Sequence, residues 1–387
     1  MKQAISNWIV SIMFITIIFS LSLATLLSDK KLFSEEENRF LKPLPQLTYD
    51  QFVHNNLTRA YDTYLNDHFI HRYQWVRLKV TTDYLMGRKE HNGIYLSTKY
   101  LVENVKDKGK YYSDDNIHQM IQFSKNVPES SAVYFMLIPS ASAIQSYKVP
   151  PNAHTFNQWA FIQQTYGQTE PYMNNIGIYD DLLSYKHDYI YYQTDHHWTM
   201  DGAYIAYKRM AQVMDFTPVP YEDLDVKTVS KDFKGSLHTK SGFDHVQSDV
   251  MKAIDHDNID EFIVYNGENK QTHEGIYFEA YLTKKDKYTY FLGINQPKVT
   301  IKTKTPSDRQ LLIFKDSYAH CLVPFLTYTY DKITLIDMRY VNSDILSDLQ
   351  LSDYNDILFM YSIDVILNTK NTSKLTYMYK SAKMGDE

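Results

Sequence analysis

Short apolar runs separated by helix-like segments constrain the fold of this chain more than any other feature. Four such runs occur, at residues 132–138, 311–314, 333–336 and 357–361. Runs of this kind are typical of strands that are buried on both faces of a parallel sheet. Helix-like stretches follow the second and third runs, at residues 318–329 and 343–351. This alternation predicts an α/β fold in which helices flank a parallel sheet.

The pattern changes between Asp232 and Lys304. The segments are short, such as residues 261–265 and 299–303, of which the second alternates apolar and polar side chains, and turns containing glycine separate them. Strict alternation is typical of strands with one buried face, as in antiparallel hairpins. We therefore expect an antiparallel β-rich insertion at about residues 232–305.

Three regions are expected along the chain. Residues 1–30 would form a membrane anchor or a signal peptide, and residues 31–110 a polar connector with a helical segment. Apolar residues recur at helical spacing from Tyr49 to Val80 within that connector. Residues 111–387 would form the main domain, which includes the β-rich insertion.

The N-terminal region carries a segment long enough to cross a membrane. Residues 8–27 contain no charged side chain, and about 20 apolar residues in a helix cover a ~30 Å hydrocarbon core. A cleaved signal peptide is the alternative, with Ser22-Leu23-Ala24 as a weak cleavage site, but its apolar core would usually be shorter. The basic residues do not orient the segment, because Lys2 and the amino terminus balance Lys30 and Lys31.

Composition excludes several classes of function. A formal charge of −6 and a pI near 6.2 provide no basic surface for nucleic acid. Cys321 is the single cysteine, so the chain forms no intrachain disulfide and no cysteine-based metal cluster of its own. The 34 tyrosines offer flat amphipathic rings that would suit sugar rings on a surface.

Two short polar stretches contain the residue types of nucleophilic catalysis. The first is Thr194-Asp195-His196-His197-Trp198-Thr199, which follows the strand-like residues 189–192. We expect a helix after it, capped by Thr199 and with Asp201 in its first turn. The second is Lys315-Asp316-Ser317-Tyr318, between the apolar run at 311–314 and a helix-like stretch. Both stretches are therefore predicted to be strand-to-helix turns.

These stretches supply the groups that acyl transfer needs. A serine such as Ser317 is a weak nucleophile until a neighbouring base accepts its proton. His197 is a candidate base, and Asp195 would lie on the same side of an extended segment and orient its ring. A metal site is the alternative for Asp195, His196 and His197. No second cluster in the sequence completes such a site, so no metal is predicted.

At these two stretches the sequence resembles the DHHW proteins, which are SGNH-hydrolase-like and related to the alginate O-acetyltransferases AlgJ and AlgX. Asp195-His196-His197-Trp198 and Asp316-Ser317-Tyr318 carry the likeness. Further stretches of the DHHW pattern follow one another along the chain: Glu37-Asn38-Arg39, Asn66-Asp67-His68-Phe69 with Arg72, Gly235-Ser236-Leu237, Asp286-Lys287-Tyr288 and Gly293-Ile294-Asn295. The resemblance implies an SGNH-hydrolase-like fold for the main domain.

The resemblance also implies roles for individual residues. Ser317 would be the nucleophile, His197 the base and Asp195 its orienting partner. The alginate enzymes have a threonine where this chain has His196, so His196 is not the implied catalytic histidine. The backbone N–H of Ser317 is the first candidate oxyanion donor. Further candidates for oxyanion or substrate binding, several of them near the ends of predicted strands, are Asn295, Arg339, Tyr361, His196 and Trp198.

The function implied by the resemblance is O-acetyl transfer to a polysaccharide outside the cytoplasmic membrane. The acetyl group would come through a membrane-bound O-acyltransferase partner, and no cofactor is expected. Three alternatives remain open from the residues alone. The same groups would serve an esterase that uses water as acceptor, the tyrosines a non-catalytic polysaccharide-binding protein, and the Asp-His-His cluster a metal-dependent hydrolase.

Overall fold

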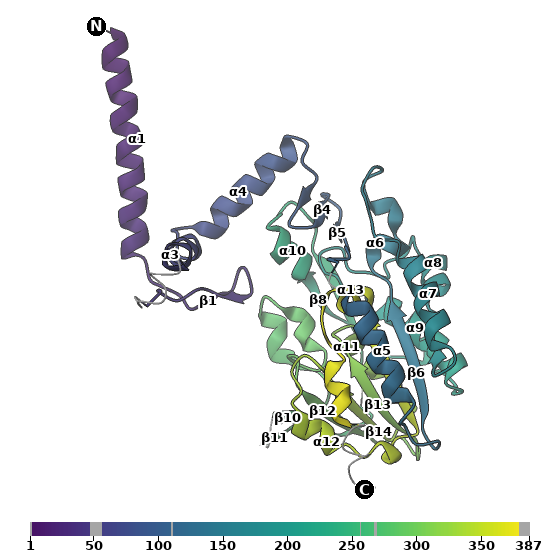
Figure 1. Cartoon of the computed structure of the whole chain (residues 1–387). Coiled ribbons are helices and arrows are strands. Elements are labelled where there is room, and N and C mark those ends of the chain that lie inside the picture. Colours follow the sequence, from purple (N-terminus) through teal and green to yellow (C-terminus); the bar gives the residue numbers. More distant parts are fainter. Residues whose placement is uncertain (1, 47–55, 110, 256, 267–268, 379–387) are drawn as a thin grey trace. The chain divides into compact units, whose positions relative to one another are not determined.

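The computed structural model describes residues 2–46, 56–109, 111–255, 257–266 and 269–378 (Figure 1). The chain forms two compact units. The first holds residues 1–88 together with the short segment 239–244, and the second holds residues 89–238 and 245–387. The α/β sheet lies in the second unit, and so do residues 194–199 and 315–318, the two stretches that contain the candidate catalytic residues.

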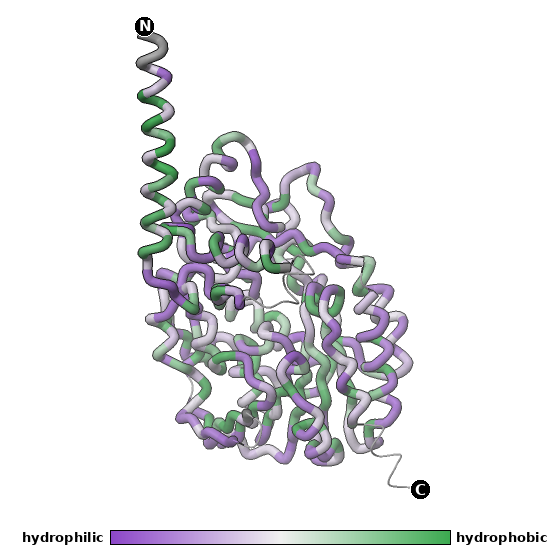
Figure 2. Tube along the Cα trace, turned by 60° about the vertical axis from the view of Figure 1, so that its left-hand side comes forward, coloured by the Kyte–Doolittle hydropathy of each residue, from purple (hydrophilic) through white to green (hydrophobic). Residues whose placement is uncertain are grey.

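The first unit starts with the apolar helix α1 (Lys2–Leu27). An 18-residue stretch within residues 6–27 has a mean hydropathy of 2.4, and almost none of it is buried. Figure 2 shows largely hydrophobic residues along it. In length and composition α1 fits a membrane-spanning anchor or a signal sequence.

Two helices make up the described part of the helical segment predicted at 49–80. They are α3 (Asn56–Asp67) and α4 (Arg72–Leu85), and residues 47–55 lie outside the described residues. The helix breaks before α4, where His71 adopts a left-handed backbone with φ of 53°. Non-glycine residues rarely adopt this conformation, and it cannot continue a right-handed helix.

A small hairpin precedes these helices and is tied to them. It consists of β1 (Phe33–Ser34) and β2 (Arg39–Phe40), paired antiparallel. The Arg39 guanidinium donates two hydrogen bonds to the Asp67 carboxylate, at 3.0 and 2.6 Å. Glu37-Asn38-Arg39 and Asn66-Asp67-His68-Phe69, two stretches of the DHHW pattern, are therefore joined in this unit.

The second unit is built on an eight-stranded sheet with the order β11-β10-β12-β14-β13-β15-β6-β7. Its four central strands are those predicted from the apolar runs: β6 (Ala132–Ile138), β13 (Gln310–Lys315), β14 (Lys332–Ile336) and β15 (Asp356–Ser362). These strands pair in parallel, and β7 (Asn174–Asn175) joins β6 in parallel at the edge. The predicted α/β class with a parallel sheet is confirmed.

Antiparallel strands extend the other side of this sheet. They are β10 (Ile259–Asn266), β11 (Asn269–His273) and β12 (Lys298–Thr303). β12 pairs antiparallel with β14, so these strands continue the central sheet. A separate antiparallel hairpin consists of β8 (Val226–Phe233) and β9 (Asp249–Ile254).

Helices cover both faces of the sheet and enclose two apolar cores. One core lies beneath α8 (Tyr179–Ser184), α9 (Met200–Val213) and α11 (Ala319–Leu326). The opposite core involves α5 (Tyr112–Ser124), α7 (Gln158–Thr169), α12 (Ser343–Ser347) and α13 (Ile363–Asn368). The shorter elements are β3 (Glu90–His91), β4 (Ile94–Leu96), β5 (Leu101–Glu103), α6 (Ala141–Ile144) and α10 (Ser236–Ser241).

Candidate active site

Ser317 lies at the carboxyl end of a central strand. β13 ends at Lys315 and α11 begins at Ala319, so Ser317 occupies the tight turn between them. The buried carboxylate of Asp316 fixes this turn by accepting hydrogen bonds from the backbone N–H groups of Tyr318 (3.0 Å) and Ser362 (2.7 Å). Ser317 itself is partly exposed while both of its neighbours are buried.

The segment before His197 differs from the prediction. Residues 189–192 are not a strand of the sheet, because only Tyr191 pairs, through an isolated antiparallel bridge with Trp198. The chain therefore doubles back between residues 192 and 198. Within this loop the Asp195 carboxylate accepts a hydrogen bond from the backbone N–H of His197 at 2.9 Å. A side chain that bonds the backbone two residues on forms an Asx turn, so a turn brings the pair together and not an extended segment.

The predicted helix after this loop is present. α9 starts at Met200, and the Thr199 hydroxyl caps it by accepting a hydrogen bond from the Gly202 N–H at 3.2 Å. Asp201 lies in the first turn, as expected. The Thr199 hydroxyl also donates to the Tyr189 carbonyl at 2.7 Å, which ties the two sides of the loop together.

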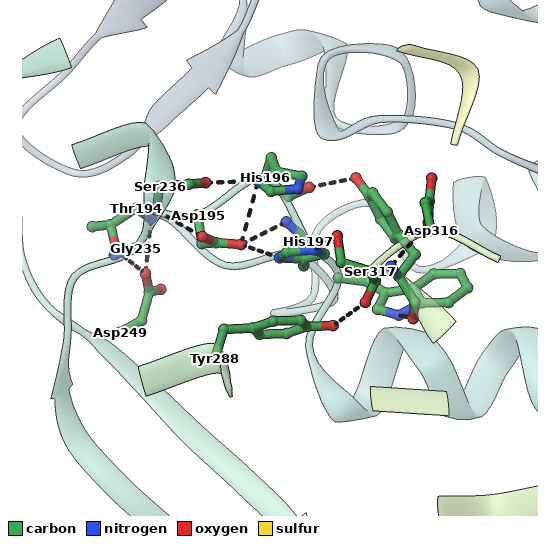
Figure 3. A network of polar contacts seen from close by, with 12 residues as sticks. Thr194, Asp195, His196, His197, Gly235, Ser236, Asp249, Tyr288, Asp316 and Ser317 are labelled. Carbon is green, nitrogen blue, oxygen red and sulfur yellow. Dashed lines mark hydrogen bonds and ion pairs between the residues drawn. The ribbon is translucent and has the colours of Figure 1, made fainter. Parts of the chain in front are cut away.

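The structure brings Asp195, His197 and Ser317 into one line of hydrogen bonds (Figure 3). His197 Nδ1 is 2.5 Å from Asp195 Oδ1, and His197 Nε2 is 2.7 Å from Ser317 Oγ. An ionised carboxylate only accepts hydrogen bonds, so Nδ1 carries the proton. Nε2 is then the lone-pair nitrogen, and it faces the hydroxyl of Ser317.

Burial and neighbouring charges set the protonation of this pair. Burial alone would raise the pKa of Asp195, but the charges of His197 and His196 and two hydrogen bonds hold it well below its usual range. Burial, together with the charge of His196, lowers the pKa of His197 to about 4 despite the nearby Asp195. At neutral pH the site therefore contains a carboxylate and a neutral imidazole, which is the state a general base requires.

A second set of contacts holds Asp195 from behind. The backbone N–H of Ser236 donates to Asp195 Oδ2 at 2.7 Å. Gly235 leaves space for this approach, since a Cβ atom there would lie 2.3 Å from the Asp195 side chain. The stretch Gly235-Ser236, noted in the sequence only through the resemblance, therefore lies directly against the site.

A buried carboxylate also supports the start of the loop. Asp249, at the beginning of β9, accepts hydrogen bonds from the backbone N–H groups of Gln193 and Thr194, both at 2.7 Å. The hydroxyls of Thr194 and Tyr189 also donate to it, each at 2.5 Å. Burial raises the pKa of Asp249, and these donors oppose that effect. Sequence spacing gave no signal for this residue, because 54 positions separate it from Asp195.

Tyr288 is the neighbour of His197 that sequence reasoning did not place. Its ring stacks on the imidazole with centroids 3.8 Å apart and planes 4° from parallel. Its hydroxyl donates to the Ser317 carbonyl at 3.2 Å (Figure 3). Tyr288 therefore contacts both the base and the turn that carries the serine, although its only sequence signal was the Asp286-Lys287-Tyr288 stretch of the resemblance.

His196 and Trp198, two further candidates, have different surroundings. His196 is partly exposed, its Nδ1 lies 2.6 Å from Ser236 Oγ, and its ring lies 3.8 Å from that of His197. It therefore borders the site from the solvent side. Trp198 is wholly buried, and its indole N–H donates to the Tyr318 carbonyl at 3.0 Å. Its contacts are with the protein interior, where it supports the serine turn.

The remaining candidates cluster near the carboxyl ends of β13, β14 and β15. Arg339 forms a bidentate pair with the buried Asp337, at 2.9 and 2.6 Å. Asn295 Oδ1 lies 3.5 Å from Lys315 Nζ. Tyr361 is wholly buried, and its hydroxyl has no hydrogen-bond partner among the described residues. All three lie near the strand ends, but no hydrogen bond joins them to Ser317 within the described chain.

Lys315 is a buried cation two residues before Ser317. Its ammonium lies 2.6 Å from His320 Nε2 and 3.6 Å from Asp337 Oδ2. Burial lowers the pKa of Lys315 to about 8, although Asp337 opposes the shift. Burial and the charge of Lys315 lower the pKa of His320, which stays neutral and accepts a hydrogen bond from the ammonium.

The metal alternative has three residues to draw on. Asp195, His196 and His197 offer ligand atoms within 4.8 Å of one another. Both ring nitrogens of His197, however, already have hydrogen-bond partners in Asp195 and Ser317. An ion bound to this imidazole would have to replace one of those two bonds, so the arrangement fits proton transfer better than metal binding.

The family model described as "DHHW protein" matches residues 107–336. A search of curated protein sequences gives no match. A solved DHHW family protein from Eubacterium siraeum is 21% identical, with a TM-score of 0.62 over 74% of this chain and 96% of that one.

Two further solved structures match this chain. PatB1 from Bacillus cereus, solved with a sulfonyl adduct, is 20% identical, with a TM-score of 0.56 over 72% of this chain and 97% of that one. The O-acetyltransferase domain of AlgJ from Pseudomonas putida is 11% identical, with a TM-score of 0.45 over 75% of this chain and 99% of that one. At these identities the likeness to the Eubacterium protein and to PatB1 is one of fold.

Proposed function

The chain belongs to the DHHW family, and from this premise we propose that it is a serine-dependent O-acetyltransferase that acts on polysaccharide hydroxyls. The observation that carries the proposal is the unbroken line of hydrogen bonds from Asp195 through His197 to Ser317. In this line a buried carboxylate holds a neutral imidazole against a partly exposed serine hydroxyl. This is the arrangement that activates a serine for attack on an acyl group.

The first half of the reaction forms an acyl-enzyme. Ser317 Oγ attacks the carbonyl carbon of an acetyl ester while His197 Nε2 takes its proton. Asp195 stabilises the imidazolium that forms. The tetrahedral intermediate then collapses, the leaving oxygen takes the proton from His197, and the acetyl group stays on Ser317.

The second half transfers the acetyl group. A sugar hydroxyl gives its proton to His197 and attacks the acetyl carbonyl, and collapse of the intermediate frees Ser317 with its proton restored. Each intermediate carries a negative oxygen that needs hydrogen-bond donors. Within the described chain the backbone N–H of Ser317 has no acceptor, so it is our first candidate, with the Asn295 amide as the second.

The resemblance supports the choice of donor and acceptor. Proteins of this pattern are related to alginate O-acetyltransferases, so we propose a polysaccharide acceptor and a membrane-bound O-acyltransferase as the supplier of acetyl groups. The apolar helix α1 would anchor the chain in the membrane, with the second unit outside the cytoplasm. Asn295 and Arg339 would line the acceptor side and His196 would border its solvent edge, whereas Tyr361 is buried and would not touch the acceptor.

A second candidate function is an acetyl esterase with the same triad. The partial exposure of Ser317 favours it, since water can reach the acyl-enzyme and take the place of the sugar hydroxyl. The two functions differ only in the acceptor. They are separated by asking whether acetyl groups end on an oligosaccharide or in free acetate.

The test uses the full chain in detergent with 4-nitrophenyl acetate, with and without short oligosaccharides. We expect Ser317→Ala and His197→Ala to lower kcat by about 10³-fold or more. Ser184→Ala, at the exposed end of α8, should keep wild-type turnover. Acetylated oligosaccharide would identify a transferase, and acetate alone an esterase.

Two controls address the remaining alternatives. A chelator should leave turnover unchanged. Loss of turnover in its presence would favour the metal-dependent hydrolase. Since PatB1 is known with a sulfonyl adduct, we expect a sulfonyl fluoride to inactivate this chain and to add its mass to the peptide that contains Ser317. Full turnover by Ser317→Ala would exclude the triad. Absence of turnover in the wild-type chain and in both variants alike would favour the non-catalytic polysaccharide-binding protein.

A further inference from the structure

Helix α4 has an apolar face that packs within the first unit. Val80 is wholly buried, and Tyr84, four residues on, stacks at 4.7 Å on the ring of Phe243. Arg77 forms an ion pair with Asp244 on the same side. These contacts attach α4 to the segment 239–244 and account for one side of the helix.

The other side of α4 is also apolar, and it is exposed. Trp75, Leu78 and Leu85 lie about 140–160° around the helix axis from Val80, at about 100° per residue. Their exposed fractions are 47%, 57% and 79%. Scattered exposed apolar residues are ordinary, but three large ones aligned on one helix face mark a surface that something covers.

The start of α4 is fixed beside the end of α1. The backbone N–H of Ile70, two residues before α4, donates to Thr25 Oγ1 at 3.2 Å. Thr25 is in the last turn of α1, which ends at Leu27. If α1 crosses the bilayer, α4 therefore begins at the boundary between hydrocarbon and headgroups.

The positive charge of α4 and the residues just after it favours contact with an anionic lipid surface. Residues 72–89 contain five basic side chains and one acidic one, Asp83. Arg72 pairs with Glu37 and Arg77 with Asp244, so the segment and these two partners together carry a net charge of +2. Asp83 pairs with Lys79 at 2.6 Å and lies away from the exposed apolar strip. Basic helices with Trp and Leu on one face are typical of membrane interfaces, where Trp favours the headgroup level and the cations attract anionic lipid.

We propose that α4 lies along the membrane surface, with Trp75, Leu78 and Leu85 inserted among the lipid headgroups. The bilayer then covers the face opposite Val80, and the segment 239–244 faces away from the lipid. The chain would contact the membrane twice, through α1 and through α4. This contact is independent of the catalytic proposal and is tested without any activity measurement.

The experiment places the full chain in lipid nanodiscs and labels single introduced cysteines with an environment-sensitive fluorophore. The native Cys321 is buried and should stay unlabelled. Leu78→Cys and Leu85→Cys probe the strip, and Gln164→Cys, at an exposed position of α7, is the matched control. At positions 78 and 85 we expect blue-shifted emission that lipids with nitroxide headgroups quench and aqueous iodide hardly quenches. At position 164 we expect no blue shift, strong quenching by iodide and little quenching by the nitroxide lipids.

Two results would overturn the proposal. Equal iodide quenching at positions 78, 85 and 164 would place the strip in water. Protection of positions 78 and 85 from both quenchers would mean that protein covers the strip, either another part of this chain, a second copy or a partner. A charge variant adds a further test, because Leu78→Glu combined with Leu85→Glu should abolish lipid quenching of a label at Trp75→Cys. Anionic lipid should strengthen the lipid quenching in the wild-type background.

Discussion

The two loops that carry the proposed triad are built in the same way around an aspartate. Asp195 accepts the backbone N–H of His197, two residues on, and that of Ser236 from a distant loop. Asp316 likewise accepts the N–H of Tyr318, two residues on, and that of Ser362. The difference is that Asp195 has an additional bond to His197 Nδ1. Among the described residues, the Asp316 carboxylate accepts hydrogen bonds from backbone N–H groups alone.

Asp316 is thus a carboxylate that shapes a turn, whereas Asp195 shapes a turn and, in our proposal, also takes part in proton transfer. Both turns need an acceptor with two oxygens, because two N–H groups converge on each side chain. Only the first turn needs the negative charge during the reaction, when the imidazolium forms. In our proposal the same geometry therefore serves structure alone in one loop and structure together with catalysis in the other.

The largest expected effect comes from removing the two charges separately. Asp195→Asn should lower kcat by about 10³–10⁴-fold, since it removes the negative charge that stabilises the imidazolium and lets an amide N–H face Nδ1, which favours the wrong tautomer. Asp316→Asn loses one backbone hydrogen bond, which is worth about 1 kcal/mol, and should mainly lower stability. Turnover of 4-nitrophenyl acetate and thermal unfolding of both variants measure the two effects. Equal losses of kcat would show that the loops do not differ in role.

A smaller but still large effect is expected from steric pressure on Asp195. Gly235→Ala would place a Cβ 2.3 Å from the Asp195 side chain and displace it from His197. A misplacement of ~1 Å costs about 10²-fold in rate. Gly167→Ala is the control, because nothing lies within 4 Å of its Cβ position and its helix α7 favours alanine. Wild-type kcat in Gly235→Ala would mean that this loop tolerates movement of the carboxylate.

The two loops also differ in how far the sequence predicts them. The serine turn was predictable, because the apolar run at 311–314 and the helix after it are local patterns that the sheet uses directly. The histidine loop was not, because residues 189–192 have the composition of a strand but are held by Trp198 and by Asp249. Tertiary packing overrides β propensity in such segments.

The residues of the candidate site also divide into those that the sequence predicts and those that it does not. Asp195, His197 and Ser317 were identified from residue types and the resemblance, and the structure brings them together. The surrounding residues Tyr288 and Asp249 come from positions distant in the sequence, and no periodicity marks them. Their roles depend on which segments the fold places side by side, and a single sequence does not contain that information.

Tyr288 bridges the two loops and allows a finer test of their coupling. Tyr288→Phe keeps the ring on His197 and removes the hydrogen bond to the Ser317 carbonyl, so kcat should fall by roughly 2–10-fold. Tyr288→Leu also removes the stacking, which is worth about 0.5–1.5 kcal/mol beyond burial, and should cost more. Steady-state kinetics of both variants separate the two contributions. A larger loss in the Phe variant than in the Leu variant would contradict this assignment.

The smallest expected effect is a shift of the acid limb of the pH profile. The reaction needs neutral His197, whose pKa burial and His196 lower to about 4, so kcat/KM should rise with pH through that value and be level by neutral pH. His196→Gln removes the repelling charge, so the pKa of His197 and the midpoint of the limb should both move up, by less than about one pH unit. Profiles of kcat/KM from pH 3.5 to 8 measure the midpoint. A downward shift, or a wild-type limb at pH 6.5, would show that His196 does not act through its charge or that His197 is less buried during catalysis than in this structure.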